Sequence, residues 1–247
     1  MIKLERVMTP ILLSPKVVAA LTQQFIYSGK SVWNNDKIKK VLKYLSNSKC
    51  AYCECDLTKS GAYMEVDHFA DKSNYPNKVM EWDNLIPSCK RCNAVKGAHD
   101  VVAEPIINPF LDQPKDHLAL RMFFIVHKSD LGNSTIACLN LNDFDKLLKA
   151  RFKIATEIIN QLTEIKKSYD AAVLNKKPNE INSTRNRLIK IIQQCMPNSE
   201  FCGIAANALY NDKRYIYLRS NMIKNCHWSD DLIEYDARCG YFSLDDL

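Results

Sequence analysis

Residues 50–97 decide the fold, because they begin with CAYC (residues 50–53) and end with CKRCNAVKG (residues 89–97). Two Cys-x-x-Cys pairs can place four thiolates at the corners of a tetrahedron around one zinc ion. We therefore expect a structural zinc site made of Cys50, Cys53, Cys89 and Cys92. The two pairs lie farther apart than in a zinc ribbon, so the ion would close a sizeable excursion of the chain.

The other cysteines give no second ligand set. Cys55 is ambiguous, because it could replace Cys53, although the Cys-x-x-Cys spacing favours Cys53. The remaining five are scattered, and scattered cysteines usually behave as small buried apolar side chains.

Composition sets broad limits on the class of protein. A chain of 247 residues with 47% hydrophobic and 25% charged residues can form one large or two small globular domains. The sequence has no apolar run of membrane-spanning length and no signal-peptide core, so we expect a cytoplasmic protein without a membrane partner. The net charge of +6 is compatible with binding a polyanion but is too modest to establish it.

The segment between the cysteine pairs carries groups suited to phosphodiester hydrolysis. Asp67 is a hard anionic ligand and Asn93 a neutral oxygen ligand, and both suit Mg²⁺ or Mn²⁺. His68 can be neutral near physiological pH and can take a proton from water. Neighbours on a strand point to opposite faces, so the strand must end or bulge near His68 for these groups to converge. Asn84 would then brace the loop that follows.

Turn and capping signals predict the local structure of the first half. An extended arm over residues 1–13 precedes helices over 15–27 and 36–45. The lysines of the second helix favour a solvated face over a phosphate-contacting one (Lys37, Lys39, Lys40 and Lys43). Strands over 51–57 and 62–69, joined by a turn at Ser60-Gly61, would form a hairpin; a loop over 70–83 and a helix carrying Cys92 follow.

The second half is expected to be mainly helical. Strands are expected over 121–128 and 135–139, and a long helix begins at Asn142 and ends before the break at 176–178. Further helices are expected over 183–195, 201–210 and 215–224. Three regions result: an N-terminal arm with helices (1–48), a zinc-knuckle domain (49–120) and a helical region (121–247) that carries no catalytic constellation.

The motif Asp67-His68, Asn84 and Asn93, framed by the two cysteine pairs, resembles the HNH (ββα-metal) endonucleases in their zinc-knuckle form. The resemblance implies an α+β fold, with a ββα-metal core and four-cysteine zinc knuckles embedded in a mainly helical protein. It implies His68 as general base, Asp67 and Asn93 as ligands of a catalytic Mg²⁺ or Mn²⁺, and Asn84 as a structural brace. Many family members have His where this chain has Asn93.

A narrower resemblance links residues 40–120 to the HNH subunit (PtuB) of Septu-type anti-phage systems. It rests on VDHF (66–69), KSNYP (72–76) and WDNL (82–85), and continues through INPF (107–110). It implies a bacterial defence nuclease that acts with an ATPase of the ABC/SMC-like class (PtuA-type), to which residues 121–247 would bind.

Two other functions remain open from the sequence. One is an endonuclease acting on RNA, such as a tRNA-like fold, because HNH chemistry does not require deoxyribose. The other is a zinc-knuckle nucleic-acid-binding module that does not cut. DNA is the expected substrate, and Lys90, Arg91 and Lys96 are candidate phosphate contacts.

Overall fold

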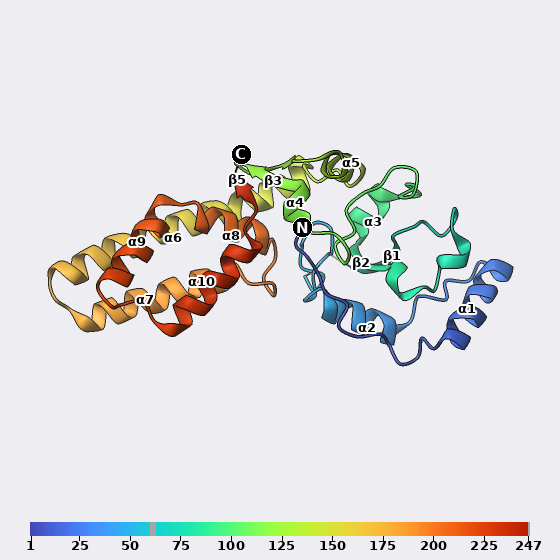
Figure 1. The fold of residues 1–247 in the computed structure, drawn as a ribbon, viewed down its shortest axis with the longest axis horizontal. Helices are drawn as coiled ribbons and strands as arrows, with labels where there is room; N and C mark the ends of the chain where they lie inside the picture. The colour runs from blue at the N-terminus through green and yellow to red at the C-terminus, as the bar shows by residue number, and fades with distance from the viewer. Residues whose placement is uncertain (60–62, 247) are drawn as a thin grey trace. The chain divides into compact units, whose positions relative to one another are not determined.

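The computed structural model describes residues 1–59 and 63–246, and its chain divides into two compact units (Figure 1). The first unit comprises residues 1–118 and 126–141, and the second comprises residues 119–125 and 142–247. Helices dominate and the sheets are small, which confirms the expected α+β class. None of the helices in the described part of the chain has the apolar length that a membrane crossing needs.

Two capped helices open the first unit, as predicted. α1 (Pro15–Ser28) begins with proline at its first turn and ends at Gly29, whose φ of 66° suits glycine. α2 (Asp36–Leu45) begins at Asn35, whose side chain accepts a hydrogen bond from the backbone N–H of Lys37. Ile38 and Leu42 of α2 join a core cluster with residues of the sheet.

The sheet of the first unit differs from the predicted hairpin. β1 (Met64–His68) pairs antiparallel with β2 (Leu85–Cys89), in a register that sets Glu65 opposite Ser88 and Asp67 opposite Ile86. α3 (Lys90–Lys96) follows directly and completes the ββα unit. The predicted strand over 51–57 is wrong, because these residues form turns with one isolated bridge between Lys49 and Asp56. The predicted turn at Ser60-Gly61 lies outside the described residues.

The loop between the strands holds two 3₁₀ turns, Pro76–Lys78 and Trp82–Asn84. Beyond α3, the first unit adds α4 (Pro114–His117) and α5 (Asp130–Cys138). The predicted strand over 135–139 is wrong: Ser129 accepts a hydrogen bond from the N–H of Gly132 and starts α5 instead.

A three-stranded sheet of order β4-β3-β5 is built from segments at the sequence boundary of the units and at the end of the chain. It contains β3 (Leu118–Arg121), β4 (Phe124–His127) and β5 (Asp245–Asp246). β5 is parallel to β3 and pairs with Ala119 and Leu120. The prediction of one strand over 121–128 is therefore half correct.

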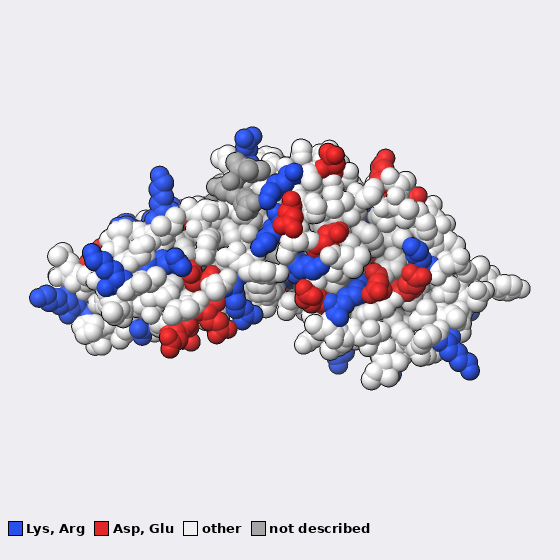
Figure 2. Space-filling view, viewed as in Figure 1, with Lys and Arg blue, Asp and Glu red and all other residues white. Residues whose placement is uncertain are grey.

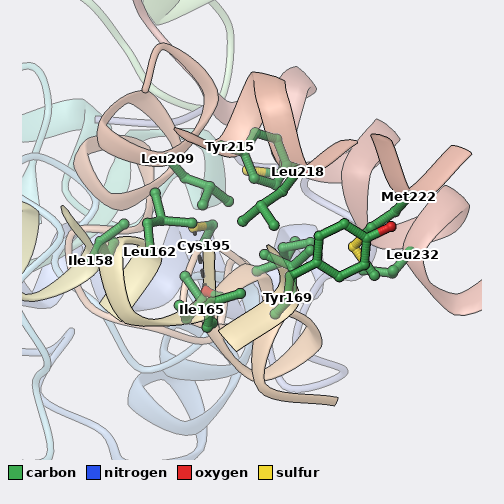
Figure 3. Close-up of a cluster of buried hydrophobic side chains, with 14 of the residues drawn as sticks. Ile158, Leu162, Ile165, Tyr169, Cys195, Leu209, Tyr215, Leu218, Met222 and Leu232 are labelled. Carbon is green, nitrogen blue, oxygen red and sulfur yellow. Dashed lines mark hydrogen bonds between the residues drawn. The ribbon is translucent and has the colours of Figure 1, made fainter. Parts of the chain in front are cut away.

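Helices form the rest of the second unit: α6 (Lys149–Leu174), α7 (Pro178–Gln193), α8 (Cys202–Tyr210), α9 (Lys213–Lys224) and α10 (Asp230–Phe242). A π-helical turn, Phe144–Leu148, precedes α6. Their apolar faces meet in one core, of which Ile158, Leu162, Leu209 and Leu218 are part (Figure 3). The break at 176–178 is confirmed, whereas the sequence analysis did not anticipate α10.

Charged side chains of both signs are interspersed on the face shown in Figure 2. The net charge of +6 is therefore not gathered there into a single basic surface.

Candidate functional site

The four predicted zinc ligands come together. Cys50 and Cys53 lie in the turns before β1, Cys89 ends β2 and Cys92 lies in the first turn of α3. All four are buried, and their sulfur atoms lie within 4.8 Å of one another. The turn is possible because Glu54 adopts a left-handed conformation with φ 67°.

The sulfur geometry fits a zinc ion. Tetrahedral zinc with bonds of about 2.3 Å separates its sulfur ligands by about 3.8 Å. The Sγ atoms of Cys53 and Cys89 are 3.8 Å apart. Cys55 is not among the four mutually close sulfurs, which agrees with the preference for Cys53 as the ligand. These four residues would therefore hold a structural zinc ion that ties β2 and α3 to the preceding turns.

His68 is the last residue of β1, and it is buried. Its Nε2 lies 3.0 Å from the carbonyl oxygen of Val79, which can only accept, so Nε2 carries the proton. Trp33 meets the imidazole edge-on at a centroid distance of 4.5 Å. Burial, with a smaller contribution from the charge of Lys72, lowers the pKa of His68 to about 4. The imidazole is therefore neutral at pH 7, and its Nδ1 is left to accept a proton.

Asp67 is held in a buried network on the opposite face of β1. Its Oδ1 accepts a hydrogen bond from Lys96 Nζ at 3.1 Å, and its Oδ2 accepts one from the Tyr52 hydroxyl at 2.6 Å. Lys96 also donates to the carbonyl oxygen of His68 at 2.7 Å. Burial raises the pKa of Asp67, although Lys96 and Tyr52 oppose this effect.

Asn93 contacts a different carboxylate. Its Nδ2 donates to Oε2 of Glu65 at 2.6 Å. Glu65, Asn93 and His68 line one cavity of about 500 Å³. Asp67 does not line this cavity. The structure therefore brings His68 and Asn93 together with Glu65, to which the sequence analysis assigned no role.

Asn84 makes three hydrogen bonds to backbone groups of the loop between β1 and β2. Its Oδ1 accepts from the N–H of Ala70 at 2.7 Å, and its Nδ2 donates to the carbonyl oxygens of Ala70 and Lys78, both at 3.0 Å. These bonds tie the start of the loop to the segment that carries Val79, the partner of His68.

The three candidate phosphate contacts are placed differently from one another. Lys90 is exposed at the start of α3. Arg91 donates to the carbonyl oxygens of Leu139 and Asn140, at 3.1 and 2.6 Å. Lys96 is only 3% exposed and is engaged by Asp67, so its ammonium does not reach a bound strand in this conformation.

Other cations line the cavity instead. Lys39 of α2 and Lys72 of the loop contribute to its wall, as do side chains that precede α2 (Ser31, Trp33 and Asn34). The basic face of the predicted second helix was the signal for Lys39, but the sequence favoured a solvated role for it. Nothing in the spacing of residues 31–34 indicated that they approach β1.

Comparison with known proteins identifies the family to which this chain is related. The family model "HNH endonuclease" matches residues 50–99. The Septu protein PtuB of Bacillus thuringiensis is 39% identical over 220 residues, which cover 86% of this chain and 84% of that protein. The Septu protein PtuB of Bacillus mycoides (strain KBAB4) is 27% identical over 159 residues, covering 51% of this chain and 53% of that protein.

No solved structure gives a significant match. The family match spans the segment that holds the sulfur cluster, His68 and Asn93, and the longer alignment extends far beyond it. The resemblance inferred from the motifs is thus confirmed: the chain is an HNH endonuclease of the Septu PtuB family.

Proposed function

We propose that this nuclease hydrolyses phosphodiester bonds of DNA in a metal-dependent reaction, with His68 as the general base. The observation that carries the proposal is the cavity in which His68, Asn93 and two lysines converge. With Nε2 bound to Val79, Nδ1 of His68 would take the proton from the attacking water. Lys39 and Lys72 would contact the phosphate.

A divalent cation would be held here by oxygen ligands. Asn93 offers an amide oxygen, and two carboxylates of β1, Asp67 and Glu65, are the candidates for its partner. When bound, Mg²⁺ or Mn²⁺ supplies compensation for charge on the phosphoryl and leaving oxygens. Asn84 takes no part in the reaction itself; it would hold the loop so that Val79 stays in contact with His68.

A cleavage assay tests this function. Supercoiled plasmid DNA and total RNA are incubated with the zinc-loaded protein in Mg²⁺ or EDTA, with and without its ATPase partner. We expect cleavage of DNA that requires Mg²⁺ and is lost in His68→Ala. His127→Ala is the matched control, because His127 is exposed in the same unit. Cleavage that persists in His68→Ala would refute the mechanism, and cleavage of RNA alone would assign the substrate to RNA.

We also propose that the helical residues 121–247 bind an ATPase of the ABC/SMC-like class. α9 exposes Ile216 and Ile223, which are 52% and 50% exposed and lie seven residues apart on one helix face. Replacement of both by Asp in the full-length chain should abolish co-purification of the ATPase and leave the fold intact. Unchanged co-purification would exclude this face as the binding surface.

A further inference from the structure

The turn between α1 and α2 forms part of the cavity wall, although it lies outside residues 50–99, which the family model matches. The N–H of Asn34 donates to the carbonyl oxygen of Ser31 at 3.1 Å and closes the turn. The N–H of Asn35, the cap of α2, donates to the carbonyl oxygen of Trp33 at 2.8 Å. The backbone of Trp33 is therefore tied to the start of a capped helix.

The indole ring of Trp33 is held by side chains of both helices. Trp33 is partly buried, and its ring meets that of Phe25 in α1 edge-on, with 5.5 Å between the centroids and 69° between the planes. It also packs against the apolar cluster that contains Ile38 and Leu42 of α2 and Val79 of the loop. A large ring packed in this way has few orientations open to it.

The same ring contacts the proposed general base. The centroids of Trp33 and His68 are 4.5 Å apart and their planes cross at 87°, which is the favoured edge-to-face arrangement of aromatic rings. Nζ of Lys72, which also lines the cavity, lies 5.7 Å from the centre of the indole ring, within range of a cation–π interaction. Indole, imidazole and ammonium thus form one cluster at the cavity wall.

The hydrogen bond from His68 to Val79 holds one atom of the imidazole but not the plane of its ring. Nε2 lies 3.0 Å from the carbonyl oxygen of Val79. The terminal torsion of a histidine side chain is broad, so rotation about the Cβ–Cγ bond would break this contact and exchange the two nitrogens. The edge-on contact with Trp33 restricts that rotation. The proton then stays on Nε2, and Nδ1 stays free to accept one.

We propose that Trp33, from the turn before α2, is a positioning residue for the general base. It holds the His68 imidazole in the orientation in which Nε2 remains on Val79 and Nδ1 takes the proton from water. The proposal rests on the role of His68 proposed above. It extends the site beyond the segment that the family model matches.

Nitrogen NMR of the imidazole tests this role without any need for turnover. Full-length, zinc-loaded, ¹⁵N-labelled protein is studied without Mg²⁺ at about pH 8, where an ordinary imidazole is neutral. The signals of His68 are those missing from His68→Gln. In the parent we expect one protonated and one unprotonated ring nitrogen with well separated shifts, and nuclear Overhauser effects between the indole and imidazole protons. Absence of these effects in the parent would overturn the proposal, whatever the variants do.

Substitutions of two tryptophans separate the ring contact from apolar packing. Trp33→Leu and Trp33→Met remove the ring but keep an apolar side chain, whereas Trp33→Phe keeps a ring. Trp82→Leu is the matched control, because Trp82 packs against the same cluster and is not among the described residues that line the cavity. The fold of each variant is checked by its zinc content and by urea unfolding.

In Trp33→Leu and Trp33→Met the two nitrogen shifts of His68 should move toward each other, because the tautomers exchange once the ring can rotate. In Trp33→Phe and Trp82→Leu the shifts should stay apart as in the parent. The proposal is overturned if Trp33→Leu keeps the parent shifts, if Trp82→Leu averages them equally, or if Trp33→Phe averages them as fully as Trp33→Leu does.

Cleavage of DNA in Mg²⁺ gives a second measurement. In Trp33→Leu kcat should fall by about tenfold or more, because a catalytic group displaced by about 1 Å can cost about a hundredfold in rate. The change in KM should be smaller, and Trp33→Phe should recover most of kcat. A rise in KM at unchanged kcat would contradict a positioning role.

The outcome is separable from that of the proposed function. A parent protein that cuts DNA through His68, while Trp33→Leu keeps both the parent shifts and the parent kcat, would refute only the role of Trp33. A parent protein whose fixed tautomer is lost in Trp33→Leu, but which cuts no nucleic acid, would refute the function and leave the positioning contact.

Discussion

The buried Asp67–Lys96 pair makes a quantitative prediction about stability. In Lys96→Met the ammonium that donates to Asp67 at 3.1 Å and to the His68 carbonyl at 2.7 Å is lost, while the apolar stem is kept. Hydrogen bonds to charged groups contribute about 1.5–3 kcal/mol each, and breaking a buried ion pair costs about 3–5 kcal/mol. We therefore expect the free energy of unfolding to fall by about 3–5 kcal/mol at pH 8.

The loss of unfolding free energy in Lys96→Met should become smaller as the pH falls. Burial raises the pKa of Asp67, and loss of Lys96 removes the charge that opposes this rise. In the variant the folded protein therefore binds a proton that the unfolded chain does not. A group whose pKa is higher in the folded state adds stability as the pH decreases. Protonation of Asp67 would then restore part of the stability that the Lys96 ammonium provides in the parent protein.

A double-mutant cycle measures the coupling. Urea unfolding is followed by tryptophan fluorescence in a Trp228→Phe background, because Trp33 and Trp82 then report on the first unit alone. Asp67→Asn in the Lys96→Met chain should recover about 1–3 kcal/mol, since it removes the uncompensated charge.

An exposed pair is the matched control for burial. Nζ of Lys149 lies only 2.6 Å from Oδ1 of Asp145, but the two side chains are 60% and 72% exposed. Both residues lie in the second unit, so Lys149→Met is followed through Trp228 in a chain with Trp33→Phe and Trp82→Phe, and it should cost less than about 1 kcal/mol. If Lys96→Met costs no more than this control, or if the two substitutions at Asp67 and Lys96 add without coupling, the reasoning about the buried pair is refuted.

Three further predictions concern neighbouring groups. The pKa of His68 lies near 4 in the folded protein, below its unfolded value, so stability decreases as the pH falls; between pH 7 and pH 5 the parent should lose about 2 kcal/mol more than His68→Gln in urea unfolding. Cys53→Ser should release zinc, measured by elemental analysis, and unfold the first unit, whereas Cys55→Ser should keep a full zinc content. Asn84→Ala removes the partner of three backbone groups, two of them buried, and should lower the free energy of unfolding by about 2–4 kcal/mol, whereas the exposed Asn77→Ala should change it by less than about 0.5 kcal/mol.

The parts of the fold that could be predicted from the sequence are those fixed by local chemistry. The cysteine pairs indicate their own geometry, because few arrangements other than a metal site use two Cys-x-x-Cys turns. α1 has proline in its first turn and glycine directly after its last residue, and α2 has the Asn35 cap; both helices begin where the sequence indicated.

Strand pairing failed because it is not local. The alternating residues 51–57 resemble a strand, but two cysteines of the sulfur cluster lie in or beside this segment, and their approach requires a turn, in which Glu54 has a positive φ. Met64–His68 then pairs with Leu85–Cys89, across a loop whose length gave no sign of the partner. Likewise, Thr135 and Ile136 favour a strand by their β-branching, yet the cap at Ser129 and the packing of α5 favour a helix more strongly.

The site shows the same division between residue type and placement. The motif names Asp67 and His68 as neighbours, and neighbours on a strand face opposite ways, so only one of them can share a side with α3 and the other must face Trp33. The motif does not indicate which side chains of α3 face which side chains of β1. That arrangement sets Asn93 against Glu65 and Lys96 against Asp67, and it begins at Cys89 and Cys92 of the sulfur cluster, which lie at the start of α3. An ion held by the four cysteines would thus help to set which side chain of α3 meets each carboxylate of β1.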